Sequence, residues 1–241
     1  MINEIPLENL LVIDIETVSI QPNFKALSEE WQQLWQDKVS RTLPINTSAE
    51  EFYPQRAGVM AEFSKVVCIS LGYFKKEKGI YNFRVKSLSN RDESLLLVAF
   101  LDTLNQLQIA HKHWNFTGHN IKEFDVPFLC RRLLINSLQI PQCLDLQNKK
   151  PWETNLVDTF QFWRFGDYKN FTSLKLLAAS LNVPSPKDDI DGSMVGAVYW
   201  EEDDLNRIAR YCQKDIVTVA NIVLRFKNLP LLLDEQIILS K

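Results

Sequence analysis

Asp14 and Glu16 are the first residues of the chain whose types and spacing could do chemistry. They follow the apolar run Leu10–Ile13, which has the length and composition of a buried strand. Side chains two positions apart on a strand project from one face, so these carboxylates would lie side by side and repel. A cation between them removes the repulsion, and oxygen ligands of this kind suit Mg²⁺ or Mn²⁺. With 15 Asp and 15 Glu an Asp-x-Glu triplet is expected about once by chance, but a solvated pair has little reason to end a buried strand.

Asp125 lies in a second segment, residues 118–129, that predicts a strand end, a short loop and the start of a helix. A carboxylate in this position has an ordinary interpretation as a helix cap or a first-turn residue stabilised by the helix dipole. The other interpretation makes it a ligand of the cation site. The segment alone does not decide between them.

Tyr211 and Asp215 are four residues apart in a long periodic segment, so they share the apolar helix face that carries Ile208. A buried carboxylate costs several kcal/mol unless it is paired or binds a metal. Asp215 therefore requires a partner. The alternative to a metal is a position at the helix edge, with Lys214 or Arg210 as its partner.

Together the three segments resemble the DEDD exonuclease superfamily. The matching residues are Asp14-Ile15-Glu16-Thr17 in its first motif, Asn120, Phe124, Asp125, Phe128 and Leu129 in its second, and Tyr211 and Asp215 in its third, in the tyrosine version. The chain is most similar to stand-alone bacterial relatives of the proofreading 3′–5′ exonuclease domain of family B DNA polymerases. The resemblance runs from Leu10 to Arg225 and includes Asp191-Gly192-Ser193 and the Tyr211-Cys212 pair.

The resemblance implies that two divalent ions, Mg²⁺ or Mn²⁺, support hydrolysis of nucleotides from a 3′ end. By similarity, Asp14, Glu16 and Asp215 hold the first ion. Asp14 also bridges to the second ion, which Asp125 supports directly or through water. Tyr211 is expected to orient the attacking water, because a phenol with a pKa near ~10 is a poor general base at neutral pH.

Three further residues match family positions beside the terminal nucleotides. Asn120 is expected to bond a sugar or base, Phe124 to stack on a base, and Thr17 to contact the 3′ nucleotide through its backbone. A loop amide and a core ring are equally good interpretations of the first two. Asp158 is interpreted as a structural strand-end carboxylate. His119 is not a catalytic substitute, since the histidine branch of the family places its histidine where Tyr211 stands.

The order of elements predicts an α/β fold with a ribonuclease-H-like mixed sheet flanked by helices, in a single domain over residues 1–241. The expected strands are Leu10–Ile13, a hairpin of Val66–Phe74 with Ile80–Val85, and Trp114–Gly118. The expected helices are Phe24–Arg41, Ser89–Leu107, Phe124–Leu138, Leu174–Leu181 and Leu205–Phe226. A helical insertion at about residues 22–64 separates the first strand from the hairpin, and the stretch between its helix and Lys65 is expected to be irregular.

Composition narrows the class of partner. With 27 Lys and Arg against 30 Asp and Glu, the net charge of −3 excludes a broad electrostatic footprint on duplex nucleic acid. The longest apolar stretch, Leu95–Leu101, is too short to span a membrane, and no basic-then-apolar start marks the chain for secretion, so a cytoplasmic location is expected. The expected substrate is a single-stranded DNA 3′ end. RNA, or a catalytically silent nucleic-acid-binding module, is the alternative, and no polymerase or repair partner is identified.

Overall fold

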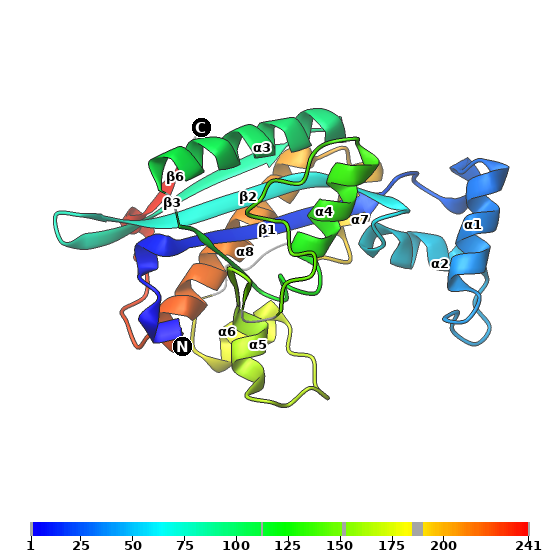
Figure 1. The fold of residues 1–241 in the computed structure, drawn as a ribbon. Helices are drawn as coiled ribbons and strands as arrows, with labels where there is room; N and C mark the ends of the chain where they lie inside the picture. The colour runs from blue at the N-terminus through cyan, green and yellow to red at the C-terminus, as the bar shows by residue number, and fades with distance from the viewer. Residues whose placement is uncertain (1, 112, 151–152, 185–189, 241) are drawn as a thin grey trace.

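A six-stranded mixed sheet forms the centre of the computed structural model, which describes residues 2–111, 113–150, 153–184 and 190–240 (Figure 1). Its strand order is β5-β4-β1-β2-β3-β6. The strands are β1 (Leu10–Ser19), β2 (Ser64–Glu77), β3 (Ile80–Ser89), β4 (Asn115–Gly118), β5 (Leu156–Asp158) and β6 (Ile237–Leu239). The pairs β1/β2 and β2/β3 are antiparallel, whereas β4 lies parallel to β1 and β5 parallel to β4. The α/β fold with a mixed sheet and flanking helices is confirmed, as is the β2–β3 hairpin beside the first strand.

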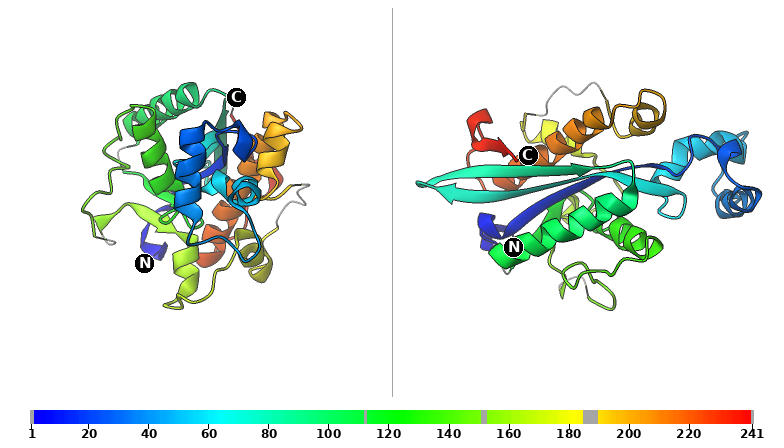
Figure 2. Two further views of the ribbon diagram at one scale, coloured as in Figure 1. Left: turned by 90° about the vertical axis from the view of Figure 1, so that its right-hand side faces the viewer. Right: turned by 90° about the horizontal axis from the view of Figure 1, so that it is seen from above.

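Helices cover both faces of this sheet. The α-helices in the described parts of the chain are α1 (Glu29–Val39), α2 (Ala49–Arg56), α3 (Glu93–Ala110), α4 (Asp125–Ile135), α5 (Thr159–Arg164), α6 (Leu174–Ser180), α7 (Val195–Trp200) and α8 (Leu205–Phe226), of which α1 and α2 lie outside the sheet. On one face α3 and α4 pack against Leu11, Ile13 and Ile15 of β1. On the other face α8 packs against Leu10 and Val12. The view from above in Figure 2 shows α3 and α8 on opposite sides of the strands.

The segment between β1 and β2 folds as an arm that projects beyond the end of the sheet (Figure 1). The single helix expected over Phe24–Arg41 is wrong in its first turn, because Asn23 caps a 3-10 turn (Phe24–Ala26) and Ser28 caps a separate helix, α1. The expectation of irregular structure up to Lys65 is also wrong. Ser48 and Glu51 form a capping box there that starts α2.

Strand β1 is longer than its apolar run. Its pairing with β2 continues to Ser19, with a register shift between Glu16 and Thr17, so Asp14 and Glu16 lie inside the strand and not at its end. Such irregularities change the direction of side chains and occur often beside active sites. The helix Leu205–Phe226 is confirmed with its predicted bounds. Within the described parts of the chain, none of the helices has the length and apolarity needed to cross a bilayer.

Candidate active site

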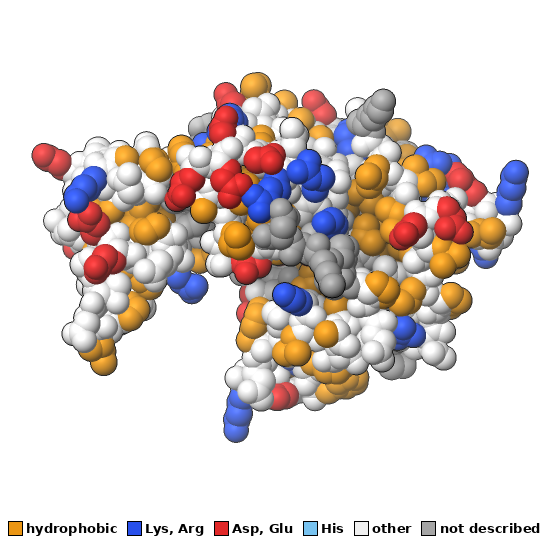
Figure 3. Space-filling model, turned by 180° about the vertical axis from the view of Figure 1, so that it is seen from behind, with side chains coloured by type: hydrophobic (Ala, Val, Ile, Leu, Met, Phe, Trp, Pro, Cys, Tyr) orange, Lys and Arg blue, Asp and Glu red, His pale blue; other side chains and the backbone are white. Residues whose placement is uncertain are grey.

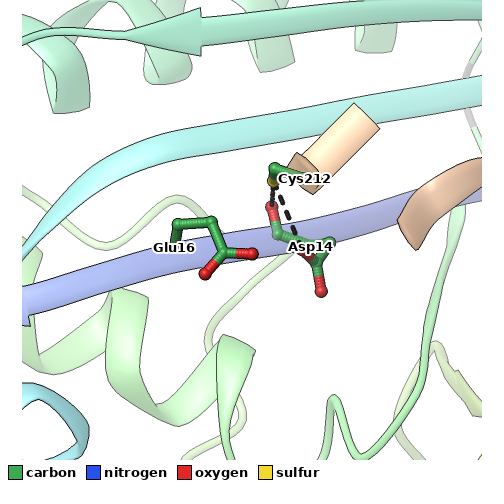
Figure 4. A group of neighbouring side chains, drawn as sticks. All are labelled: Asp14, Glu16 and Cys212. Atoms are coloured by element: carbon green, nitrogen blue, oxygen red, sulfur yellow. Dashed lines mark hydrogen bonds between the residues drawn. The ribbon is translucent and has the colours of Figure 1, made fainter. Parts of the chain in front are cut away.

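β1 places both carboxylates of the first pair on the face covered by α8. The even-numbered residues Leu10 and Val12 point toward α8, and Asp14 and Glu16 continue that alternation. In Figure 4 the two side chains leave β1 on the side where Cys212 approaches from α8. A ligand atom from each of Asp14, Glu16 and Cys212 lies within 4.8 Å of the other two. The predicted common face of the pair is thereby confirmed.

α8 brings Tyr211 and Asp215 to the same place. The Tyr211 hydroxyl donates a hydrogen bond to Asp215, and the charges of Asp14, Glu16 and Asp215 all act on Tyr211. Burial and these three carboxylates raise the pKa of the Tyr211 phenol far above its ordinary value of 10.0. The tyrosine is therefore a hydrogen-bond donor at any physiological pH.

Cys212 is a member of the cluster to which the sequence assigned no role. Its Sγ lies 3.2 Å from Asp14 Oδ2 and 3.5 Å from the Asp14 carbonyl oxygen, and the residue is fully buried (Figure 4). Burial, Cys68 and the neighbouring carboxylates raise the thiol pKa well above 9.0. The thiol therefore stays protonated and donates to Asp14. The sequence signal that could have placed Cys212 in the site was its position next to Tyr211.

Asp125 reaches the site from the other side of β1. β4 pairs with β1 only at Leu10–Val12, and beyond that stretch Asp125 Oδ1 accepts the backbone N–H of Ile15 at 3.2 Å. The carboxylate is 4% exposed and starts α4, so it is both the first-turn residue of the ordinary interpretation and a charge that acts on Asp14. The two interpretations are compatible in this structure.

The carboxylates strongly oppose one another's ionisation. Burial raises the pKa of Asp14 well above 3.8, and the charges of Asp125 and Asp215 add to the rise. Burial likewise raises the pKa of Glu16 well above 4.5, followed by the effects of Asp14 and Asp215. Four carboxyl groups in such surroundings ionise together only when positive charge is supplied.

The donor set fits a hard divalent cation. Asp14, Glu16 and Asp215 present carboxylate oxygens, which Mg²⁺ and Mn²⁺ prefer. Asp125 adds a fourth carboxylate, whose charge acts on Asp14. The one sulfur in the cluster, that of Cys212, is engaged as a donor to Asp14 and does not favour a thiophilic metal. These residues could hold a cation between β1 and the part of α8 that carries Tyr211 and Asp215.

The three residues expected to contact substrate have different surroundings. Thr17 donates its Oγ1 hydrogen to the Gly58 carbonyl at 2.6 Å, so its side chain anchors the arm and only its backbone is available. Asn120 has a left-handed backbone, with φ of 64°, and its Oδ1 is buried with no hydrogen-bond partner among the described residues. Phe124 packs against Phe128, with ring centroids 5.2 Å apart, and is half-buried. All three roles stay predictions.

Asp158 holds the second segment in place, as its structural interpretation requires. The carboxylate is 1% exposed and accepts the N–H groups of Asn120 and Lys122 at 3.0 and 3.1 Å. It also caps α5 through the N–H of Phe160 at 3.0 Å. His119 bonds Thr159 Oγ1 and the Thr172 carbonyl, so its ring is committed to the scaffold.

The sequence family that matches the chain is described as a predicted 3′–5′ exonuclease related to the exonuclease domain of PolB, over residues 59–238. The chain belongs to this family. The match includes Asp125, Tyr211 and Asp215 and leaves out Asp14 and Glu16, which the structure places beside them. The description of the family as a predicted 3′–5′ exonuclease agrees, at the level of a nuclease hydrolase, with the enzyme class expected from the sequence.

The fold also occurs in a solved polymerase. The structure of the family B DNA polymerase from the hyperthermophilic archaeon Pyrobaculum calidifontis matches with a TM-score of 0.53 and 16% sequence identity. The similarity covers 92% of this chain and 24% of the polymerase, so the chain corresponds to about a quarter of that protein's length. At this identity the similarity concerns the fold. No match was found among curated proteins.

Proposed function

We propose that the protein hydrolyses nucleotides from the 3′ end of single-stranded DNA, with two Mg²⁺ or Mn²⁺ ions held by Asp14, Glu16, Asp125 and Asp215. The observation that carries this proposal is the convergence of three of these carboxylates, from β1 and α8, around the hydroxyl of Tyr211. When bound, the ions supply an activated water and stabilise the charge of the leaving oxygen.

Tyr211 positions the attacking water and does not remove its proton. A neutral phenol is a poor general base, so the raised pKa of Tyr211 favours a positioning role, in which the hydroxyl, held by Asp215, accepts or donates a hydrogen bond at a fixed point. This arrangement supports assignment to the tyrosine branch of the superfamily. Cys212 serves the same end by fixing the carboxylate of Asp14.

Asn120 offers a contact for the terminal nucleotide. Its unpaired Oδ1 is a buried acceptor, and such an atom is costly unless a donor reaches it. A sugar hydroxyl or an exocyclic base amine has the needed donor. We assign Phe124 to stacking on the terminal base and the Thr17 backbone to contact with the 3′ nucleotide, because these residues are next to Asp125 and Glu16 in the sequence.

Single strands are the proposed substrate because the net charge of −3 gives no broad attraction for duplex DNA. Contacts to a few phosphates and unpaired bases then supply the affinity. None of the sequence motifs specifies a contact to the RNA 2′-hydroxyl, so RNA is a comparison arm of the test.

The test uses 5′-labelled single-stranded DNA and RNA of one sequence, incubated with Mg²⁺, Mn²⁺ or EDTA and resolved on a gel. We expect a ladder shortened from the 3′ end on DNA, abolished by EDTA and by Asp14→Asn. Asp102→Asn, on the exposed surface of α3, is the matched control and should leave the ladder intact. DNA binding without hydrolysis under any metal would instead indicate a silent binding module.

A further inference from the structure

Helix α5 and the loop that follows it form the most aromatic part of the chain. Six of the 14 residues 159–172 are aromatic, compared with 11% of the whole sequence. Three rings in the loop are exposed to solvent: Phe165 by 92%, Tyr168 by 77% and Phe171 by 65%. We call these three residues the aromatic platform. Phe162 of α5 is exposed by 36%. Large apolar side chains left exposed together are a feature of interaction sites.

The aromatic platform is supported by the buried ring of Phe160. Phe171 packs edge-on against the fully buried Phe160, with ring centroids 4.9 Å apart. The Arg164 guanidinium lies 3.9 Å from the Phe160 ring centre and 5.6 Å from that of Tyr168. A cation between two rings fixes their orientation. The exposed rings are therefore presented by a supported loop.

Phe165 ends α5 in a left-handed conformation, with φ of 44° and ψ of 34°. A left-handed residue commonly terminates a helix, although a bulky side chain is unusual there. The Phe165 side chain is 92% exposed. The end of α5 therefore presents one large ring to solvent.

The aromatic platform is attached to the active site at several points. Arg164 forms an ion pair with Glu123 at 3.1 Å, two residues before Asp125. His119, next to Asn120, bonds both ends of the platform segment, at Thr159 and Thr172. The loop after α5 extends toward the side of the arm (Figure 1), and the space-filling view shows a notch between the arm and this part of the molecule (Figure 3).

We propose that the aromatic platform binds unpaired bases of the single strand whose 3′ end lies among the carboxylates. The inference rests on the proposed function for the position of that 3′ end. Rings that expose a face stack on bases of any sequence, and the exposed Lys169 provides positive charge for the backbone phosphates. Stacking on the aromatic platform selects single strands, because paired bases are not free to stack on it.

The first measurement is DNA affinity in an Asp14→Asn background, so that hydrolysis does not consume the probe. Fluorescence anisotropy with 5′-labelled dT12 and its RNA counterpart rU12 gives Kd for Phe165→Ala and Tyr168→Ala. We expect each substitution to raise Kd about tenfold. Tyr168→Phe keeps the ring, and Ile109→Ala removes an 86% exposed apolar side chain from α3, so neither should change Kd.

The second measurement places one abasic nucleotide at successive positions from the 3′ end. If the aromatic platform binds bases, an abasic nucleotide at one or two internal positions should lower the DNA affinity of the protein that retains Tyr168. In Tyr168→Ala, the same abasic nucleotides should cause no further loss of affinity. Unchanged Kd in both alanine variants, position-independent losses, or no binding of dT12 would overturn the proposal. Failure of the wild-type protein to hydrolyse DNA, with these binding effects intact, would refute only the proposed function.

Discussion

Replacing Asp125 with Asn should flatten the decline in stability that the metal-free protein shows as the pH rises. Burial, with a further contribution from Asp158, raises the pKa of this carboxyl from 3.8 to about 7, against the opposing effect of the Ile15 N–H. Between those two values the folded protein keeps a proton that the unfolded chain has released. Stability therefore falls as the pH rises from about 4 to about 7 and levels off above.

The size of this effect follows from the two pKa values. About three pH units at 1.36 kcal/mol per unit give up to about 4 kcal/mol. Asn is uncharged, has the same volume and retains an Oδ1 that can accept the Ile15 N–H. The stability of Asp125→Asn relative to the wild type should therefore increase by up to about 4 kcal/mol between about pH 4 and pH 8.

Urea denaturation in EDTA, followed by tryptophan fluorescence across this pH range, measures the difference. Asp102→Asn, which neutralises an exposed carboxylate on α3, should follow the wild-type curve. Parallel pH curves for Asp125→Asn and the wild type would show that Asp125 ionises normally in the fold. Adding Mg²⁺ at pH 8 should then stabilise the wild type more than the variant, because a ligand of the folded state shifts the equilibrium only where its site is intact.

Three other outcomes are expected. Tyr211→Phe should lower kcat by about 10²- to 10⁴-fold with little change in KM, since the ring stays and only the water-positioning hydroxyl is lost; an unchanged kcat with a raised KM would make Tyr211 a substrate contact. Digestion rates at several salt concentrations should rank 3′ overhangs and mismatched ends above blunt duplex, with a shallow salt dependence; equal rates, or shortening from the 5′ end, would contradict the proposed polarity. Glu93→Ala should cost about 3–5 kcal/mol in urea denaturation, because it leaves Arg132 buried without its ion pair and the Val66 N–H without its acceptor, whereas Glu50→Ala at an exposed pair should cost under about 1 kcal/mol.

Local periodicity was sufficient to predict which candidate site residues share a face of their strand or helix. Asp14 and Glu16 share a face because strand side chains alternate, and Tyr211 and Asp215 share one because they lie four apart on α8. The bounds of α8 also followed from its apolar stripe. These features depend on residues within a few positions of each other, which is why the sequence alone could predict them.

The arm shows where local signals were insufficient. The apolar spacing over Phe24–Arg41 is helical throughout, yet Asn23 and Ser28 each cap their own turn, and the chain is extended at Leu27 between them. The Ser48 and Glu51 capping box was a readable signal for α2. Competition between caps and periodicity is decided by packing, here around Trp35 and its neighbours in the arm.

The assembled site depended on tertiary structure. Cys212 bonds Asp14 across 198 positions, and Asp125 bonds Ile15 across 110. Neither contact leaves a trace in local spacing, because each is set by how α8 and α4 pack against β1. The sequence determined which carboxylates were available and which faces they occupy. Only the packing of β1, α4 and α8 decided that these faces meet, and their meeting raises the pKa values that make the cluster a candidate cation site.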